Sequence, residues 1–220
     1  DGVQGEGYLD ATSVYGYPGP IASVSNIPDD VALSFSISLC AYLRNRGVVS
    51  AFSRLHPLID YDRVLAKVGA ILNIGPTVSI DLTISNQEQW GRYRENHKRD
   101  IKYAREQGVA CVHDERWTYL DDFIDIYYDN MRRVDADDFY FFEKSYFLRL
   151  RDLLEDYVEL FVALRGNDVI AGGLFTYCDS IIQYHLGGTC TAHLDLSPSK
   201  LILDEVRRWG SSVGAKSLHL

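Results

Sequence analysis

The 220-residue chain carries a formal net charge of −9, with 46% hydrophobic and 24% charged residues. This composition is ordinary for a globular chain with a buried core, so it excludes extended disorder. No apolar run approaches the roughly 20 residues of a membrane-spanning helix, and we expect no span in this sequence. The acidic balance disfavours a large nonspecific nucleic-acid surface, because phosphate binding relies on clustered Lys and Arg. The four cysteines show no Cys-x-x-Cys spacing, which favours reduced thiols in a cytoplasmic protein without a metal site.

The first section of the chain alternates helix and strand patterns. Residues 1–27 are rich in Gly, Tyr, Pro and Ser, and the run Tyr15–Pro20 predicts an irregular loop. Apolar spacing after Pro28 predicts a helix that ends at Gly47, and strand and helix patterns follow. We expect a helix, a strand, a helix and a strand at 28–47, 48–55, 61–68 and 77–82.

A capping box marks the next helix. Ser85 and Glu88 have the spacing at which each side chain satisfies a free backbone N–H of the other residue. The pattern predicts one helix up to Gly108. Its basic stripe could contact RNA, but a solvated helix face is the usual role of such a run, and the acidic chain favours it. The stripe consists of Arg94, Lys98, Lys102 and Arg105.

From Val109 onward the predicted order is strand, two helices, three strands, helix and strand. The sequence Arg165–Asp168 is typical of a tight antiparallel hairpin turn. Ser197 and Pro198 predict a capped helix start, and Gly214 predicts its end. The expected strands are 109–113, 158–164, 169–177, 181–187 and 217–220, and the expected helices are 118–131, 143–154 and 197–213.

This order resembles the core of the GNAT acyltransferases. Several local sequences sharpen the resemblance towards the FemAB-like branch, which includes peptidoglycan aminoacyltransferases and related enzymes found with exopolysaccharide genes. These sequences are Tyr15–Pro20, Ser53–Leu58, Asn96–Ala104, Gln183–Thr189 and Leu196–Lys200. The resemblance extends over nearly the whole chain.

The resemblance implies an α+β fold of two fused GNAT-type halves, each with a mixed, mostly antiparallel central sheet. Residues 1–82 would form the first half, 83–108 a connecting helix and 109–220 the second half, with both ends of the natural protein missing. It also implies an N-acyltransferase that moves an acyl or aminoacyl group to an amine on a cell-envelope or polysaccharide precursor. Fold analogy alone supports this acceptor class.

The donor stays open between two classes. A CoA-dependent GNAT carries Gln/Arg-x-x-Gly-x-Gly/Ala at the start of the helix after its fourth strand, whereas Thr191–Lys200 has no such glycines. The donor is therefore an acyl-CoA or an aminoacyl-tRNA, and tRNA is a candidate partner. A third hypothesis is a noncatalytic GNAT-like module that binds a nucleotide sugar or a protein.

The strand that contains His185 is the candidate catalytic element. Strand alternation puts Gln183 and His185 on one face, and Ile182, Tyr184 and Leu186 on the other. His185 would relay a proton in acyl transfer, because imidazole titrates near neutral pH. A structural, hydrogen-bonded histidine is the alternative.

The start of the following helix is the candidate donor site. Free backbone N–H groups, the helix dipole and the Lys200 charge favour a phosphate or carboxylate near Ser197 and Ser199. Gly187 and Gly188 would form a bulge that opens the backbone to the donor. An ordinary capped helix with a solvated lysine is the alternative.

The acceptor site is expected mainly in the first half. Tyr15 and Tyr17 on the Gly/Pro loop, and Arg54 and His56 at a strand end, could face an acceptor with phosphate or carboxylate groups. Gln183 would contribute from the second half. A surface arginine at a strand end is the alternative for Arg54.

Overall fold

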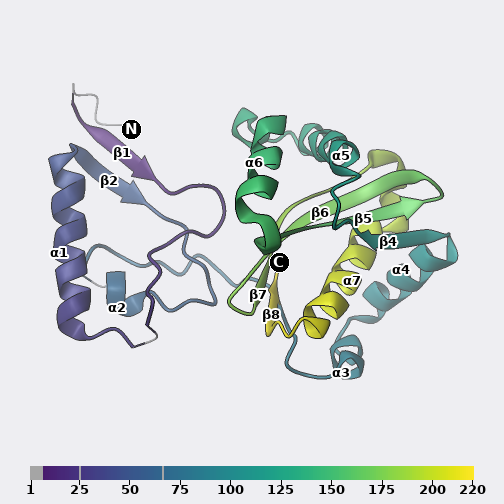
Figure 1. The fold of residues 1–220 in the computed structure, drawn as a ribbon, viewed down its shortest axis with the longest axis horizontal. Helices are drawn as coiled ribbons and strands as arrows, with labels where there is room; N and C mark the ends of the chain where they lie inside the picture. Colours follow the sequence, from purple (N-terminus) through teal and green to yellow (C-terminus); the bar gives the residue numbers. More distant parts are fainter. Residues whose placement is uncertain (1–6, 25, 66) are drawn as a thin grey trace. The chain divides into compact units, whose positions relative to one another are not determined.

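The computed structural model describes residues 7–24, 26–65 and 67–220. The chain forms two compact units, Asp1–Pro76 and Thr77–Leu220, which we call unit 1 and unit 2 (Figure 1). Within the described ranges, no helix has both the length and the apolar character that crossing a membrane requires.

Unit 1 is built around a strand–helix–strand connection. β1 (Leu9–Thr12) and β2 (Val48–Phe52) pair in parallel, and α1 (Asp29–Asn45) connects them. Parallel neighbours need such a crossover because a tight turn cannot join them. Gly47 has φ 72° and ends α1 as predicted. A single helical turn, α2 (Asp62–Leu65), follows.

No helix or strand was predicted before Pro28, so strand β1 at Leu9–Thr12 was missed. Four residues carry too little alternation to be distinguished from a loop. Their pairing comes from β2, where the Ser50 hydroxyl also donates to the Asp10 carboxylate at 2.6 Å. A partner about 40 residues away therefore decides the conformation of this segment.

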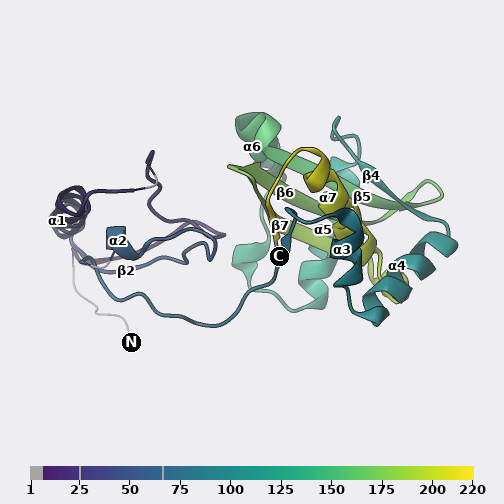
Figure 2. The same cartoon turned by 90° about the horizontal axis from the view of Figure 1, so that it is seen from below.

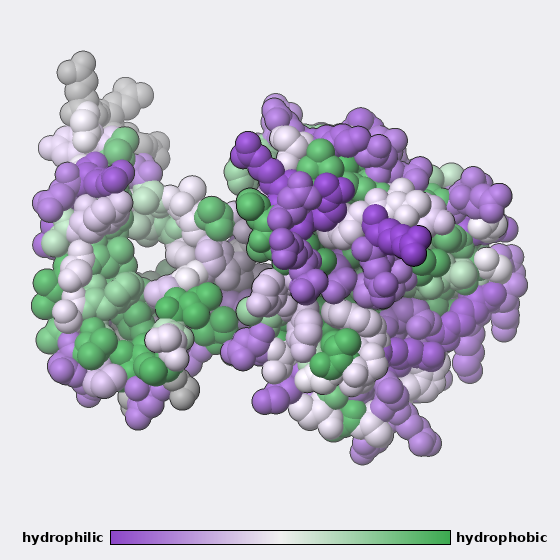
Figure 3. All heavy atoms as spheres, in the orientation of Figure 1, coloured by the Kyte–Doolittle hydropathy of each residue, from purple (hydrophilic) through white to green (hydrophobic). Residues whose placement is uncertain are grey.

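The residues of unit 1 bury little apolar surface. Ala32 and Ser36 are buried on one stripe of α1, whereas Val31, Ile37 and Tyr42 of the same helix are 51%, 62% and 55% exposed. Figure 3 shows apolar surface over the part of unit 1 that contains α1. A helix that is apolar on most sides is usually buried on most sides. In the described part of unit 1, by contrast, α1 is buried only along the stripe of Ala32 and Ser36.

Unit 2 contains a six-stranded sheet in the order β3-β8-β7-β6-β5-β4. All neighbours are antiparallel except β7 and β8, which run parallel. The expected mixed, mostly antiparallel sheet is confirmed, and β7, which contains His185, lies beside the C-terminal strand β8. The strands are β3 (Ser79–Asp81), β4 (Val109–His113), β5 (Val158–Arg165), β6 (Asp168–Cys178), β7 (Ile181–Thr189) and β8 (Ser217–His219).

Strand β3 corrects the expected boundary at residue 82. It pairs with β8, and Leu82 N–H donates to the Lys216 carbonyl at 2.9 Å. β3 is therefore an edge strand of the unit 2 sheet, not the last strand of the first half. A three-residue strand reveals no partner in its sequence, because pairing depends on which edge is open. That unit 1 is itself a GNAT-type half stays a prediction.

The single helix expected from Ser85 to Gly108 is two helices, α3 (Asn86–Gly91) and α4 (Glu95–Glu106). The capping box is confirmed, since Glu88 N–H donates to the Ser85 hydroxyl and Ser85 N–H to the Glu88 carboxylate. The chain leaves the helix after Gly91, and Arg94 is extended. Glycine is among the weakest helix formers, so a break costs least beside it.

The remaining helices agree with the predicted order. Helix α5 starts at Leu120 rather than at the expected residue 118: Tyr119 is its N-cap residue, and the Asp114 carboxylate accepts from the Tyr119 N–H at 2.7 Å. The helices are α5 (Leu120–Arg133), α6 (Lys144–Leu154) and α7 (Pro198–Ser212), with short 3₁₀ turns η1 (Asp138–Tyr140), η2 (Glu155–Tyr157) and η3 (Thr191–Leu196).

Helices cover both faces of the sheet. A Cβ on Gly172 of β6 would meet Phe123 of α5, and Ile182 of β7 reaches Gly210 of α7. Phe175, an odd number of residues after Gly172 on β6, lies in the core with α7, so α5 and α7 pack on opposite faces. Figure 1 shows α5 and α6 above the strands and α7 below them, and Figure 2 shows α3 and α4 near α7.

Candidate functional site

A β-bulge places His185 at an irregular point of the sheet. Leu174 of β6 pairs with Leu186, and Phe175 pairs with Tyr184, so His185 has no opposite residue on β6. An extra residue of this kind bends the strand and re-aims a side chain. The bulge expected at Gly187 and Gly188 is therefore two residues earlier.

The bulged histidine contacts a tyrosine of α6. Tyr146 Oη lies 2.7 Å from His185 Nε2, and both side chains are half-buried. The Tyr146 ring also stacks on Phe142, with centroids 4.5 Å apart, which fixes its direction. Burial lowers the pKa of His185 from 6.5 to about 4. The imidazole is therefore neutral at neutral pH.

This pair can move a proton without first carrying a charge. A neutral imidazole has one ring nitrogen that donates and one that accepts, and a phenol does both. A group bound at Tyr146 Oη could therefore give up a proton while the phenol proton passes to His185 Nε2. The prediction singled out His185 but missed Tyr146. The partners are 39 residues apart, and no spacing rule connects them.

The two glycines expected at the donor site have a packing role in this structure. Gly187 pairs with Gly173, and a Cβ on Gly187 would collide with the Tyr184 hydroxyl. On the other face, a Cβ on Gly188 would lie 3.0 Å from the Ile126 carbonyl oxygen of α5. Their missing side chains therefore let Tyr184 and α5 approach the sheet closely.

The start of α7 is only partly as expected. Pro198 occupies the first turn, but Ser197 adopts the left-handed conformation (φ 49°, ψ 44°), and among the described residues its side chain makes no capping bond. Ser199 is exposed. Lys200 Nζ lies 2.6 Å from the Asp100 carboxylate of α4, so a cation is present but already paired.

Gln183 is held by β8. Its Oε1 lies 2.5 Å from Nδ1 of the fully buried His219, and its Nε2 donates to the Tyr184 carbonyl at 2.8 Å. Its side-chain amide is therefore engaged at both ends, so a contact with an acceptor would compete with these bonds.

The candidate acceptor residues of unit 1 are brought together in part. The rings of Tyr17 and His56 meet edge to face, 5.7 Å apart, and Leu58 N–H donates to His56 Nδ1 at 3.1 Å. Tyr15 is half-buried on the same loop as Tyr17, whereas Arg54 is exposed after β2. Tyr17 and His56 therefore form a contact within unit 1, and an acceptor role for these residues stays a prediction.

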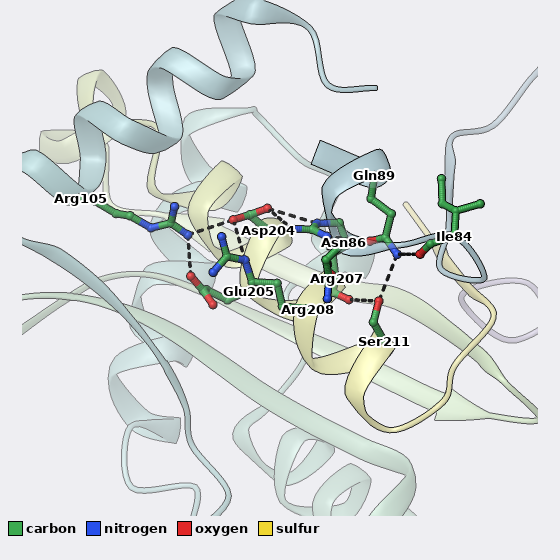
Figure 4. A network of polar contacts seen from close by, with 9 residues as sticks. All are labelled: Ile84, Asn86, Gln89, Arg105, Asp204, Glu205, Arg207, Arg208 and Ser211. Carbon is green, nitrogen blue, oxygen red and sulfur yellow. Dashed lines mark hydrogen bonds and ion pairs between the residues drawn. The ribbon is translucent and has the colours of Figure 1, made fainter. Parts of the chain in front are cut away.

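A buried charge network connects α3, α4 and α7 (Figure 4). Asp204 and Arg207 are 0% and 1% exposed and lie 2.8 Å apart. Asp204 also pairs with Arg105, which belongs to the basic stripe, and Lys98 of the stripe pairs with Glu95. Part of the stripe is thus committed to structural ion pairs. Within the described ranges, no group of three or more His, Cys, Asp or Glu side chains is placed to hold a metal ion.

Comparisons with known proteins identify the fold. No family model matches the sequence, and neither does any curated protein. Among solved structures, FemX aligns with a TM-score of 0.67 and 10% identity, over 87% of this chain and 68% of FemX.

Two further structures come from proteins named for lysylphosphatidylglycerol synthesis. The C-terminal (DUF2156) domain of a protein described as such a synthetase from Agrobacterium fabrum has a TM-score of 0.62 at 13% identity, over 87% of this chain and 59% of its own. L-PGS from Bacillus licheniformis has a TM-score of 0.59 at 13% identity, over 87% and 57%. The chain thus spans under three fifths of the length of both. At these identities the likeness establishes the FemX-like, GNAT-like fold that the sequence predicted.

Proposed function

We propose that this chain is an aminoacyl- or acyltransferase that acts on an amine of a cell-envelope component. The contact between His185 and Tyr146 at the bulge of β7 carries the proposal, because it supplies a neutral proton path. The fold shared with FemX and with lysylphosphatidylglycerol synthetases supports the reaction class. Sequence resemblance to the FemAB-like branch supports a peptidoglycan or polysaccharide precursor as acceptor.

The proposed reaction balances one proton. The acceptor amine attacks the donor carbonyl carbon, a C–N bond forms and the bond to the leaving oxygen or sulfur breaks. The amine loses one proton to Tyr146 Oη while the phenol proton moves to His185 Nε2. The same path in reverse returns a proton to the leaving group. His185 thereby ends each cycle neutral, as burial favours.

An aminoacyl-tRNA is the favoured donor. The start of α7 lacks the glycines that would expose backbone N–H groups to a CoA pyrophosphate. Lys200 at this helix start is paired with Asp100, and the negative charge of Asp100 repels a compact polyphosphate such as that of CoA. The lysyl product named for two of the similar structures supports an aminoacyl group. An acyl-CoA is the alternative donor.

The experiment measures transfer from radiolabelled aminoacyl-tRNA and from acetyl-CoA to a muramyl pentapeptide, using the whole chain. His185→Gln and Tyr146→Phe should each lower turnover roughly 100-fold, the usual contribution of a positioned acid or base. His97→Gln and Tyr103→Phe on α4 are matched controls and should keep parental turnover. Loss of melting temperature with full turnover in the first two variants would make the pair structural. Precursor binding without transfer from either donor would favour a noncatalytic module.

Lys200 is the proposed cation for the donor. If donor phosphate displaces Asp100, Lys200→Ala should raise the donor Michaelis constant about tenfold, the loss of one charge-assisted contact. Asp100→Asn frees the lysine and should lower the same constant. Unchanged constants in both variants would remove Lys200 from the site.

A further inference from the structure

Unit 2 has a pocket that the proposed reaction does not use. It encloses about 420 Å³ beside the start of β8, at the edge of the sheet. Part of its wall is apolar, made by Ile80 of β3, Ile84 and Tyr93, and Tyr93 is half-buried against the core. Pockets that hold small ligands start at roughly 300 Å³. The space therefore suits a molecule of about the size of an amino acid or a dipeptide.

Charges of both signs line this pocket. Arg92, directly after α3, and Lys216, directly before β8, contribute the cations. Both side chains are exposed, and neither forms an ion pair with another residue in the described part of the chain. Most of the other basic residues near α4 are already paired. These two cations are therefore available to an anionic ligand group.

The carboxylate of Asp81 adds the opposite charge. Its Oδ1 accepts from the backbone N–H and the hydroxyl of Thr83, at 2.9 and 2.6 Å. These bonds lower the pKa of Asp81, so it is ionised at neutral pH. A carboxylate in the wall disfavours a phosphate dianion, whereas it attracts an ammonium group. Two cations and one anion around an apolar wall match a zwitterion.

The pocket is separate from the His185 site. Its residues Lys216 and Ser217 lie just before and at the start of β8, where Ser217 pairs with Ile181 at the start of β7. His185 lies further along β7, two residues past the last paired position, and contacts α6. Tyr93 and Ile80 pack with α7, on the other face of the sheet. A ligand in the pocket would therefore not touch the proton path.

We propose that this pocket binds a small zwitterion, a free amino acid or dipeptide, with its carboxylate at Arg92 and Lys216, its ammonium at Asp81 and its apolar side chain on Ile80, Ile84 and Tyr93. The assignment rests on the pocket itself and not on the transfer reaction. It adds a ligand site at the sheet edge to a protein whose proposed chemistry lies on the opposite face.

A matched ligand series tests the proposal by calorimetric titration of the whole chain. L-leucine and glycyl-L-leucine carry both charges, 4-methylpentanoate lacks the ammonium group, and isoamylamine lacks the carboxylate. We expect saturable binding of leucine or the dipeptide and about tenfold weaker binding of each single-charge analogue. Inorganic phosphate should bind more weakly than the zwitterion.

Variants connect the binding to the pocket. Arg92→Gln, Lys216→Gln and Asp81→Asn should each weaken zwitterion binding about tenfold, and the asparagine can still accept the Thr83 bonds. Arg94→Gln, an exposed neighbour outside the pocket wall, removes the same charge as Arg92→Gln and should leave the affinity unchanged. All four variants should keep the parental melting temperature because these side chains are exposed.

Three results would overturn the assignment. The first is no saturable binding of leucine or the dipeptide up to about 10 mM. The second is binding of 4-methylpentanoate or phosphate as tight as that of the zwitterion, which would indicate a simple anion site. The third is an affinity that Arg94→Gln lowers as much as Arg92→Gln does. Each result can occur with or without transferase activity, so this test is independent of the one above.

Discussion

The two helical layers of unit 2 hold their buried polar groups in different ways. In the α7 layer, Asp204 and Arg207 form a fully buried ion pair, and Arg207 also donates to Asn86 and Gln89 at 2.8 and 2.7 Å. In the α5/α6 layer, the half-buried contact between Tyr146 and His185 is neutral. Saturated charges fix three helices to one another, whereas a neutral pair keeps a proton to exchange. The first arrangement serves stability and the second suits chemistry.

The largest expected effect is on the charged layer. Arg207→Met removes the buried partner of Asp204 and leaves two amide oxygens without their donor. Breaking a buried ion pair in this way costs about 3–5 kcal/mol, measured as the free energy of unfolding in urea. Arg208→Gln is the control, because Arg208 is 48% exposed and lies 3.4 Å from the same carboxylate. If both variants lost equal stability, burial would not explain the contribution of Arg207 to the free energy of unfolding.

The half-buried, neutral His185 should make the stability of the protein depend on pH. Burial lowers the pKa of His185 from 6.5 to about 4. As the pH falls through this range, the histidine is therefore protonated in the unfolded chain at a higher pH than in the folded chain. The stability that the neutral imidazole confers is therefore complete above pH 6.5 and is lost as the pH falls to about 4. The loss is on the order of 3 kcal/mol.

His185→Gln isolates this contribution from the carboxylates that also titrate in acid. The difference in unfolding free energy between parent and variant should change across the same pH range and stay constant above it. A difference that does not depend on pH would mean that the imidazole is not neutral through burial.

A smaller effect tests how closely α5 lies on the sheet. Gly188→Ala puts a methyl group 3.0 Å from the Ile126 backbone oxygen, which cannot move without shifting α5. Overpacking of this kind costs about 1–3 kcal/mol, measured by urea unfolding. Gly91→Ala on α3 is the control, since no atom lies within 4 Å of its added Cβ, and alanine should be neutral or stabilising there. Equal losses in the two variants would contradict the close approach.

The order of elements in unit 2 was predictable because its signals are local. The capping box at Ser85, the Gly166 turn between β5 and β6, and Pro198 at the start of α7 each act within a few residues. Such signals set where an element begins or ends but not what it pairs with. The same limit explains why β1 was missed and why β3 was assigned to the wrong unit.

The sequence singled out His185 by residue type and strand position. It predicted neither the partner of His185 nor its surroundings. The bulge that displaces it depends on how β6 and β7 align, and its contact with Tyr146 depends on where α6 packs. Arg207 and Gln89, 118 residues apart, meet for the same reason. The sequence by itself determined the order of the elements from Val109 onward, because local hydrogen bonding and periodicity encode it, and that order with several local sequences carried the family resemblance. Only the tertiary structure decided the partners and the charge states, because desolvation and contact depend on atoms that folding brings from distant parts of the chain.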